Sequence, residues 1–156
     1  MNAVILTVGR LGERWQKDGV AEYLKRLSRY GNYAVAEVPD EPDGDSPALV
    51  EKAKISEGQR LLRQIKPNDF VVALCVDGEA YSSEGLARKT AAYAMNGRRT
   101  VFVIGGSNGL SEEVIARANE RLSFSKLTFP HGLMRVVLLE QLYRAERINA
   151  GERYHK

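Results

Sequence analysis

Short apolar runs alternate along the chain with longer segments in which apolar residues recur at helical spacing. The runs are largely β-branched and bounded by polar or turn residues, which predicts buried strands. They cover residues 4–9, 33–38, 70–76 and 100–104. A fifth short strand is expected somewhere within residues 122–129.

The segments between these runs predict helices. In the first of them, Trp15, Val20 and Leu27 fall on one face and charged residues fill the other. Ser82 or Ser83 is expected to cap one helix, and Ser111 a short one with acidic residues in its first turn. The predicted helices cover residues 14–28, 48–65, 83–96, a short stretch after 111, and 133–149.

Strands that are apolar on both faces and alternate with helices are typical of a parallel sheet covered on both sides. The sequence therefore predicts an α/β fold. With 156 residues and no linker-like segment except the proline- and acid-rich loop 39–47, we expect one domain over residues 1–156.

Composition narrows the setting in which the protein works. The N-terminal apolar run has no preceding basic residue and is soon interrupted by Arg10 and Glu13, unlike a signal peptide or a membrane span. The single cysteine, Cys75, cannot form an intrachain disulfide. We expect a cytoplasmic protein that needs neither a membrane nor a metal.

The net charge of +3 is unevenly distributed. Five acids and no base lie within residues 37–45, whereas Arg88, Lys89, Arg98 and Arg99 have no acid between them. Such basic groups can contact phosphates, but they are equally compatible with an ordinary solvated surface.

Glycine-rich turns are the candidate ligand loops. The first strand ends in Gly9-Arg10-Leu11-Gly12, which lacks the G-x-G-x-x-G spacing of dinucleotide folds, and no P-loop motif occurs. A second glycine group, at residues 105–109, follows the strand at 100–104. By itself this group is either a tight turn or a loop that lets backbone approach a cofactor.

Four motifs in order make the chain resemble, from end to end, the bacterial RlmH family, the 23S rRNA pseudouridine N3-methyltransferases of the SPOUT superfamily. The motifs are FVIGGSNGL at residues 102–110, LSFSKLTFPH at 122–131, MRVVLLEQLYRA at 134–145 and YHK at 154–156. The segments LTVGRL at 6–11 and Glu22-Tyr23 are also similar to the family.

The resemblance implies a SPOUT fold in which the C-terminal segment threads through a loop as a deep trefoil knot, an exception to the rule against knots. It implies that the knot holds S-adenosylmethionine, and that a homodimer completes each site with the partner's tail. Carried over by position, the cofactor-binding residues are Leu74, Gly105, Gly106, Phe124, Ser125, Lys126, Leu127, Thr128 and Phe129.

The expected reaction methylates N3 of a pseudouridine in a 23S rRNA stem-loop, on the assembled ribosome. That nitrogen carries a proton at neutral pH, so a protein group must remove or share it. The candidate groups lie near the end of the chain. Our hypothesis is that His155 and Tyr154 approach the nucleotide, with Arg135 as their electrostatic partner. His131 is interpreted as a helix cap rather than a catalytic group.

The last predicted helix is apolar on almost every face, so a second subunit is its natural cover. Glu140 and Tyr143, one turn apart, are expected to hold the dimer or the tail. The candidate contacts to ribosomal RNA are Arg88, Lys89, Arg98, Arg99, Arg144 and Arg147.

Two other functions remain open from the sequence. A non-catalytic RNA-binding or ribosome-associated factor on the same fold would keep the basic surface but would not bind S-adenosylmethionine. A flavodoxin-like enzyme would need a phosphate loop after the first strand, which residues 9–12 do not supply.

Overall fold

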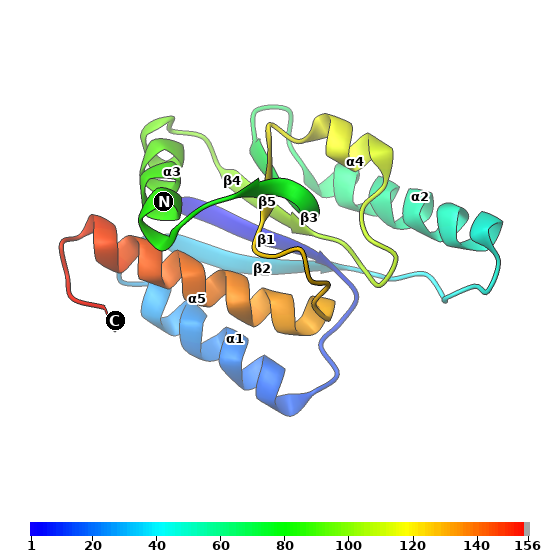
Figure 1. The fold of residues 1–156 in the computed structure, drawn as a ribbon, viewed down its shortest axis with the longest axis horizontal. Helices are drawn as coiled ribbons and strands as arrows, with labels where there is room; N and C mark the ends of the chain where they lie inside the picture. The colour runs from blue at the N-terminus through cyan, green and yellow to red at the C-terminus, as the bar shows by residue number, and fades with distance from the viewer. Residues whose placement is uncertain (155–156) are drawn as a thin grey trace.

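The structure, a computed structural model, describes residues 1–154 and contains a five-stranded sheet with helices on both faces (Figure 1). The strands are β1 (Asn2–Val8), β2 (Asn32–Val38), β3 (Phe70–Ala80), β4 (Thr100–Ile104) and β5 (Glu120–Ser123). The helices are α1 (Arg14–Leu27), α2 (Pro47–Gln64), α3 (Ser83–Met95), α4 (Glu112–Arg117) and α5 (His131–Asn149).

All neighbouring strands in the sheet pair in parallel, in the order β2-β1-β4-β3-β5. The predicted α/β fold with a parallel sheet is confirmed. Because every strand runs the same way, the loops that follow them gather at one edge, where ligands bind in open α/β sheets.

Alternate strand residues face two separate apolar clusters, as the period of a strand requires. Ile5 and Phe102 pack with α1, α3 and α5 on one face. Leu6 and Val103 pack with α2 and α4 on the other. In Figure 1, α1 and α5 lie side by side, and α5 also contacts α3. Among the described residues, no helix combines the length and apolar character needed to cross a bilayer.

Serine side chains fix the beginnings of three helices. Ser82 Oγ accepts a hydrogen bond from Gly85 N at 3.0 Å, and Ser111 Oγ from Val114 N at 3.4 Å, which confirms both predicted caps. Ser46 does the same for α2 through Leu49 N at 3.2 Å. Each bond satisfies a backbone donor that the first helical turn leaves unpaired.

The strand expected within residues 122–129 lies further toward the N-terminus. It covers Glu120–Ser123, because its two polar leading residues pair with β3 although they interrupt the apolar pattern. The strand then ends where Ser123 Oγ donates to Ser125 O at 3.0 Å, since local side-chain bonds compete with strand pairing. Most of the segment is therefore a loop.

The start of α5 also differs from the prediction. The helix begins at His131, and Pro130 occupies the position before it without a side-chain cap. The interpretation of His131 as the cap is therefore wrong, because proline with its fixed φ forms the helix entry.

Arg135 ties α5 to the carboxyl ends of two strands. Its side chain is fully buried, and its guanidinium donates to Val8 O at 2.9 Å, to Gly9 O at 2.8 Å and to Glu37 Oε2 at 3.1 Å. These bonds fix the position of the first turns of α5 relative to β1 and β2.

We predict that Arg135→Met lowers the free energy of unfolding by about 3 kcal/mol, because it leaves two buried carbonyls and a carboxylate without their donor. Glu37→Gln, at a side chain that is 38% exposed, should cost about 1 kcal/mol or less. Urea denaturation of both variants measures the difference, and equal costs would contradict the assignment of Arg135 as the central donor.

Candidate ligand-binding site

A pocket of about 530 Å³ opens at the carboxyl edge of the sheet. Leu74 of β3 and Ile104 of β4 form its base, and Met134 of α5 closes one side. The glycine group 105–109 and the segment 122–131 supply the remaining walls. This volume lies within the range of about 300–1,000 Å³ usual for cofactor and small-molecule sites.

The pocket brings together most of the residues that the resemblance selected, from segments well separated in the sequence. Lys126, which is exposed, is not among the lining residues. The lining includes Leu74, Gly105, Gly106, Phe124, Ser125, Leu127, Thr128 and Phe129.

The glycine group is both a tight turn and a pocket wall. Gly109 N donates to Gly106 O at 3.1 Å, and Gly109 has a φ of +82°, which glycine adopts without strain. A Cβ on Gly105 would lie 2.7 Å from the carbonyl carbon of Gly109. The turn can close only without a side chain at residue 105.

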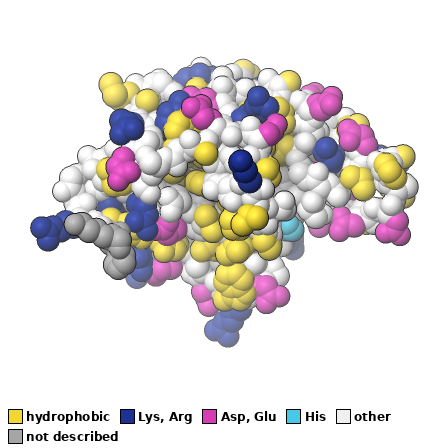
Figure 2. All heavy atoms as spheres, in the orientation of Figure 1, with side chains coloured by type: hydrophobic (Ala, Val, Ile, Leu, Met, Phe, Trp, Pro, Cys, Tyr) yellow, Lys and Arg dark blue, Asp and Glu magenta, His cyan; other side chains and the backbone are white. Residues whose placement is uncertain are grey.

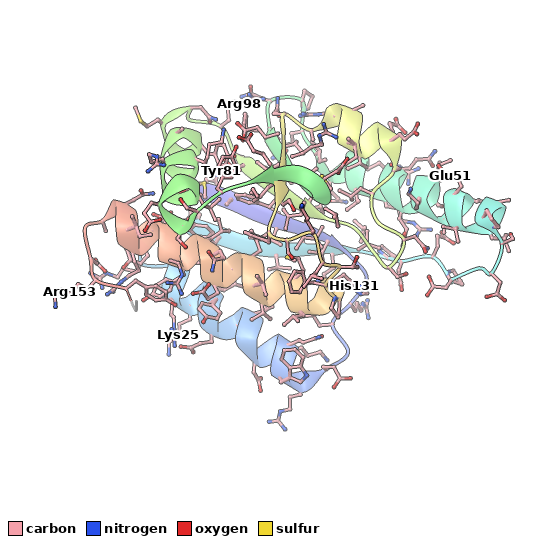
Figure 3. All side chains as sticks on the ribbon, viewed as in Figure 1. Lys25, Glu51, Tyr81, Arg98, His131 and Arg153 are labelled. Carbon is pink, nitrogen blue, oxygen red and sulfur yellow. The ribbon has the colours of Figure 1, made fainter. Side chains whose placement is uncertain are left out.

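The segment after β5 is held by its own serines. Leu127 N donates to Ser125 Oγ at 2.9 Å, which closes a short turn. This turn leaves Leu127 71% exposed at the rim of the pocket. Figure 3 shows His131 at the start of α5. This residue also lines the pocket.

Glu57 of α2 lies behind the glycine group and was not identified from the sequence. Its side chain is buried, Oε2 accepts from Glu41 N at 3.3 Å, and a Cβ on Gly106 would lie 3.2 Å from that oxygen. Burial raises the pKa of Glu57, and nearby Asp40 acts in the same direction. The sequence carries one signal for Glu57, which is its position beside Gly58. Gly58 packs directly on Ser111, so this side of α2 is buried and the neighbouring acid is buried with it.

The one thiol in the pocket wall is not a ready nucleophile. Burial and, to a lesser extent, neighbouring Asp77 raise the pKa of the Cys75 thiol to about 11, so the thiol stays protonated near neutral pH. Within residues 1–154, no group of three or more His, Cys, Asp or Glu is arranged to hold a metal ion. The walls are therefore suited to binding and orienting a ligand.

Neither of the two described residues among the proposed catalytic group lines this pocket. Arg135 is buried against β1 and β2, and His155 lies outside the described residues. Tyr154 packs on α5, where its hydroxyl donates to Glu140 Oε1 at 3.0 Å and its ring meets that of Tyr143 edge-on at 5.1 Å. Of the two expected roles for Glu140 and Tyr143, holding the dimer or the tail, the structure shows contact with the tail residue Tyr154.

Most of the candidate RNA-binding cations contact their own chain. Lys89 pairs with Glu120 at 2.7 Å and Arg99 with Asp69 at 2.5 Å. The others with intrachain partners are Arg98, on backbone carbonyls, and Arg144 and Arg147, on acidic side chains. Arg88 is exposed and has no ion pair among residues 1–154, so contact with RNA by the other five would have to compete with existing bonds.

The architecture itself indicates the class of protein. A parallel α/β sheet with an apolar pocket at its carboxyl edge, walled by a glycine turn and a C-terminal loop, is typical of proteins that bind a nucleotide-like cofactor. The chain matches the family described as "Predicted SPOUT methyltransferase" over residues 1–155.

The chain belongs to the SPOUT methyltransferase family. It is 52% identical over 159 aligned positions to "Ribosomal RNA large subunit methyltransferase H" of Bacillus cytotoxicus, and the match covers 100% of both chains. It also shares its fold with the structure of a probable methylase family protein from Haemophilus influenzae Rd KW20. That match has a TM-score of 0.58 and 14% identity, and covers 99% of this chain and 70% of the other.

We predict that Gly105→Ala destabilises the protein by about 1–3 kcal/mol, because the added Cβ meets the backbone of Gly109. Gly12→Ala is the matched control, since nothing lies within 4 Å of its Cβ and its change should stay within about 0.5 kcal/mol. Thermal and urea unfolding measure both. Equal stability of the two variants would contradict the close backbone contact between residues 105 and 109.

Proposed function

We propose that this protein binds S-adenosylmethionine in the pocket at the carboxyl edge and transfers its methyl group to N3 of a pseudouridine in large-subunit ribosomal RNA. The observation that carries the proposal is the pocket itself, formed by the glycine turn and the segment 122–131 in a member of a methyltransferase family. The full-length similarity to a protein named as a ribosomal RNA methyltransferase supports the choice of substrate. Such a protein would work in the cytoplasm.

The pocket residues fit a donor of this kind. Adenine is flat and apolar with polar edges, which suits side chains such as Leu74, Leu127 and Phe129 beside free backbone groups. Gly105 and Gly106 line the pocket, and a Cβ on either would meet protein atoms of the turn or of the residues behind it, so only glycine fits at this wall. When bound, the donor supplies a methyl group on a positively charged sulfur.

The protein's own part in the transfer is alignment and exclusion of water. With its proton removed, N3 attacks the methyl carbon in line, and the opposite charges cancel as they approach, so an apolar wall favours the step. Burial and Glu140 raise the pKa of the Tyr154 hydroxyl to about 12. In this position Tyr154 would serve as a hydrogen-bond donor, which leaves His155 as our proposed base.

A homodimer is the second part of the proposal. Figure 2 shows hydrophobic side chains gathered over the N-terminal halves of α1 and α5. Trp15 is 54% exposed and Leu127 is 71% exposed, and Leu133 and Val137 on α5 are only half-buried. A patch of this kind marks an interaction surface on a soluble protein. The partner would bring its tail to this subunit's pocket.

A trefoil knot formed by the C-terminal segment belongs to the same proposal, and two close backbone contacts are compatible with it. One lies within the glycine turn, between Gly105 and Gly109. At the other, between the paired strands β3 and β5, a Cβ on Gly78 would lie 2.6 Å from the carbonyl carbon of Leu122.

The proposal is tested by calorimetry with S-adenosylmethionine, and by transfer of radiolabelled methyl groups to ribosomes from a strain that lacks the protein. We expect donor binding and one labelled pseudouridine in the large-subunit RNA.

Thr128→Trp, which fills the pocket, should weaken donor binding at least about ten-fold, a change of roughly 1.4 kcal/mol, whereas Thr128→Ser should not. RNA binding without donor binding would instead support a non-catalytic ribosome-associated factor.

Deletion of residues 154–156 should abolish methylation but leave donor binding and the urea midpoint nearly unchanged, because Tyr154, the one of these residues that the structure describes, packs on the surface of α5. Tyr154→Phe keeps the ring packing and loses only the bond to Glu140, so it should retain most of the donor affinity. Normal turnover by the truncated protein would reject a catalytic role for the tail. Sedimentation at micromolar concentration should show a dimer in each case.

A further inference from the structure

Glu57 of α2 is a buried acid that has no ion pair among the described residues. Its side chain is 4% exposed, and its Oε2 accepts a hydrogen bond from Glu41 N at 3.3 Å. Its Oε1 is buried and has no hydrogen-bond partner within residues 1–154. The cation on the next turn of α2, Arg60, pairs with Glu41 instead. A buried carboxylate is costly without a cation, so a positive charge placed near Glu57 would be stabilising.

The Glu57 carboxylate lies directly behind the wall of the pocket at the carboxyl edge. Gly106 lines that pocket, and a Cβ on Gly106 would lie 3.2 Å from Oε2 and 3.4 Å from Oε1 of Glu57. Because glycine has no side chain, only backbone forms the wall at this point. Charges that face each other across a buried region of low dielectric are weakly screened, so Glu57 can act on a ligand without touching it.

The pocket lining itself supplies no negative charge. Among the described residues that line it, none is an aspartate or a glutamate. S-adenosylmethionine carries one net positive charge, because its ammonium and carboxylate cancel and its sulfonium does not. A cation in an apolar pocket needs an opposite charge nearby. Asp43, which accepts from Ser107 Oγ at 2.9 Å, is exposed and screened by water, whereas Glu57 is not.

The glycine turn is the part of the wall that would face the charged end of the donor. Leu74, Leu127 and Phe129 suit the adenine, which leaves residues 105–107 for the sulfonium and the amino-acid portion. The product, S-adenosylhomocysteine, keeps the adenine, the ribose and the amino acid but has a neutral sulfur. Donor and product would therefore differ at this wall in one charge and one methyl group.

We propose that Glu57 selects the cationic donor over its neutral product by acting through the Gly106 backbone. The inference rests on the proposed function, because it takes the pocket to be the donor site. Burial raises the pKa of Glu57, so its ionised form gains more from a neighbouring cation than an exposed carboxylate would. The preference would keep the product from blocking the pocket as it accumulates.

The first test is calorimetry with S-adenosylmethionine, S-adenosylhomocysteine and sinefungin, in which a protonated amine replaces the methylsulfonium. We expect the unchanged protein to bind the two cationic ligands more tightly than the neutral one. Glu57→Gln removes the charge but keeps an acceptor for Glu41 N. It should weaken both cationic ligands at least about five-fold and leave S-adenosylhomocysteine unaffected. Glu51→Gln, at an exposed position on α2 (Figure 3), is the matched control and should change none of the three affinities.

An equal loss of affinity for all three ligands in Glu57→Gln would show that Glu57 only supports the glycine turn, and overturns the proposal. Unchanged affinities overturn it as well. The unchanged protein gives a reading that does not depend on the folding of any variant, because equal affinity for the three ligands would itself exclude selection by charge. If the unchanged protein bound none of them, the proposed function would fail and this inference with it.

The second test separates binding from chemistry. Glu57 would stabilise a positive charge that disappears as the methyl group leaves, so its loss should weaken donor binding without slowing the chemical step. For ribosome methylation by Glu57→Gln we expect the donor KM to rise at least about five-fold and kcat not to fall. A lower kcat at unchanged KM would contradict the proposal.

Discussion

The close approach of backbone to backbone at the carboxyl edge of the sheet is the constraint on which the pocket depends. The chain turns back on itself at Gly105 and Gly109, and Gly78 of β3 lies against Leu122 of the neighbouring strand β5 at a shift in their register. At both places a Cβ would lie under 3 Å from backbone, so the loops can close only because the side chains are absent. The pocket is the space that remains between these closed loops and the ends of β3 and β4.

The position of α5 is the second requirement, and it depends on a buried charge. A guanidinium without exposure to water is costly unless its donors are paired. Both terminal nitrogens of Arg135 are paired, through Val8 O, Gly9 O and Glu37, while its Nε has no partner among the described residues. This anchoring positions the start of α5, where Met134 lines the pocket at the carboxyl edge.

The sequence predicted what local patterns determine. Buried strands such as β4, and the helix caps at Ser82 and Ser111, are determined by residues close to them in the sequence. The structure has them where they were expected. The glycine turn and the segment 122–131 were selected through family resemblance, and they meet in one pocket. Periodicity could not locate β5, because its leading Glu120 and Arg121 are polar. It also could not identify the partners of Arg135, which lie 98 to 127 residues away along the chain.

The proton on the acceptor nitrogen sets the chemical demand on the site. The Cys75 thiol in the pocket wall, with a pKa of about 11, and the Tyr154 hydroxyl on α5, at about 12, both hold their protons near neutral pH. General base catalysis by either would therefore be weak. The opposite charges of a sulfonium and a deprotonated imide nitrogen cancel as they approach, and a dry, apolar wall favours that cancellation. Making the nitrogen anionic is the role proposed for His155, and the pocket wall would contribute alignment of the reacting atoms and exclusion of water.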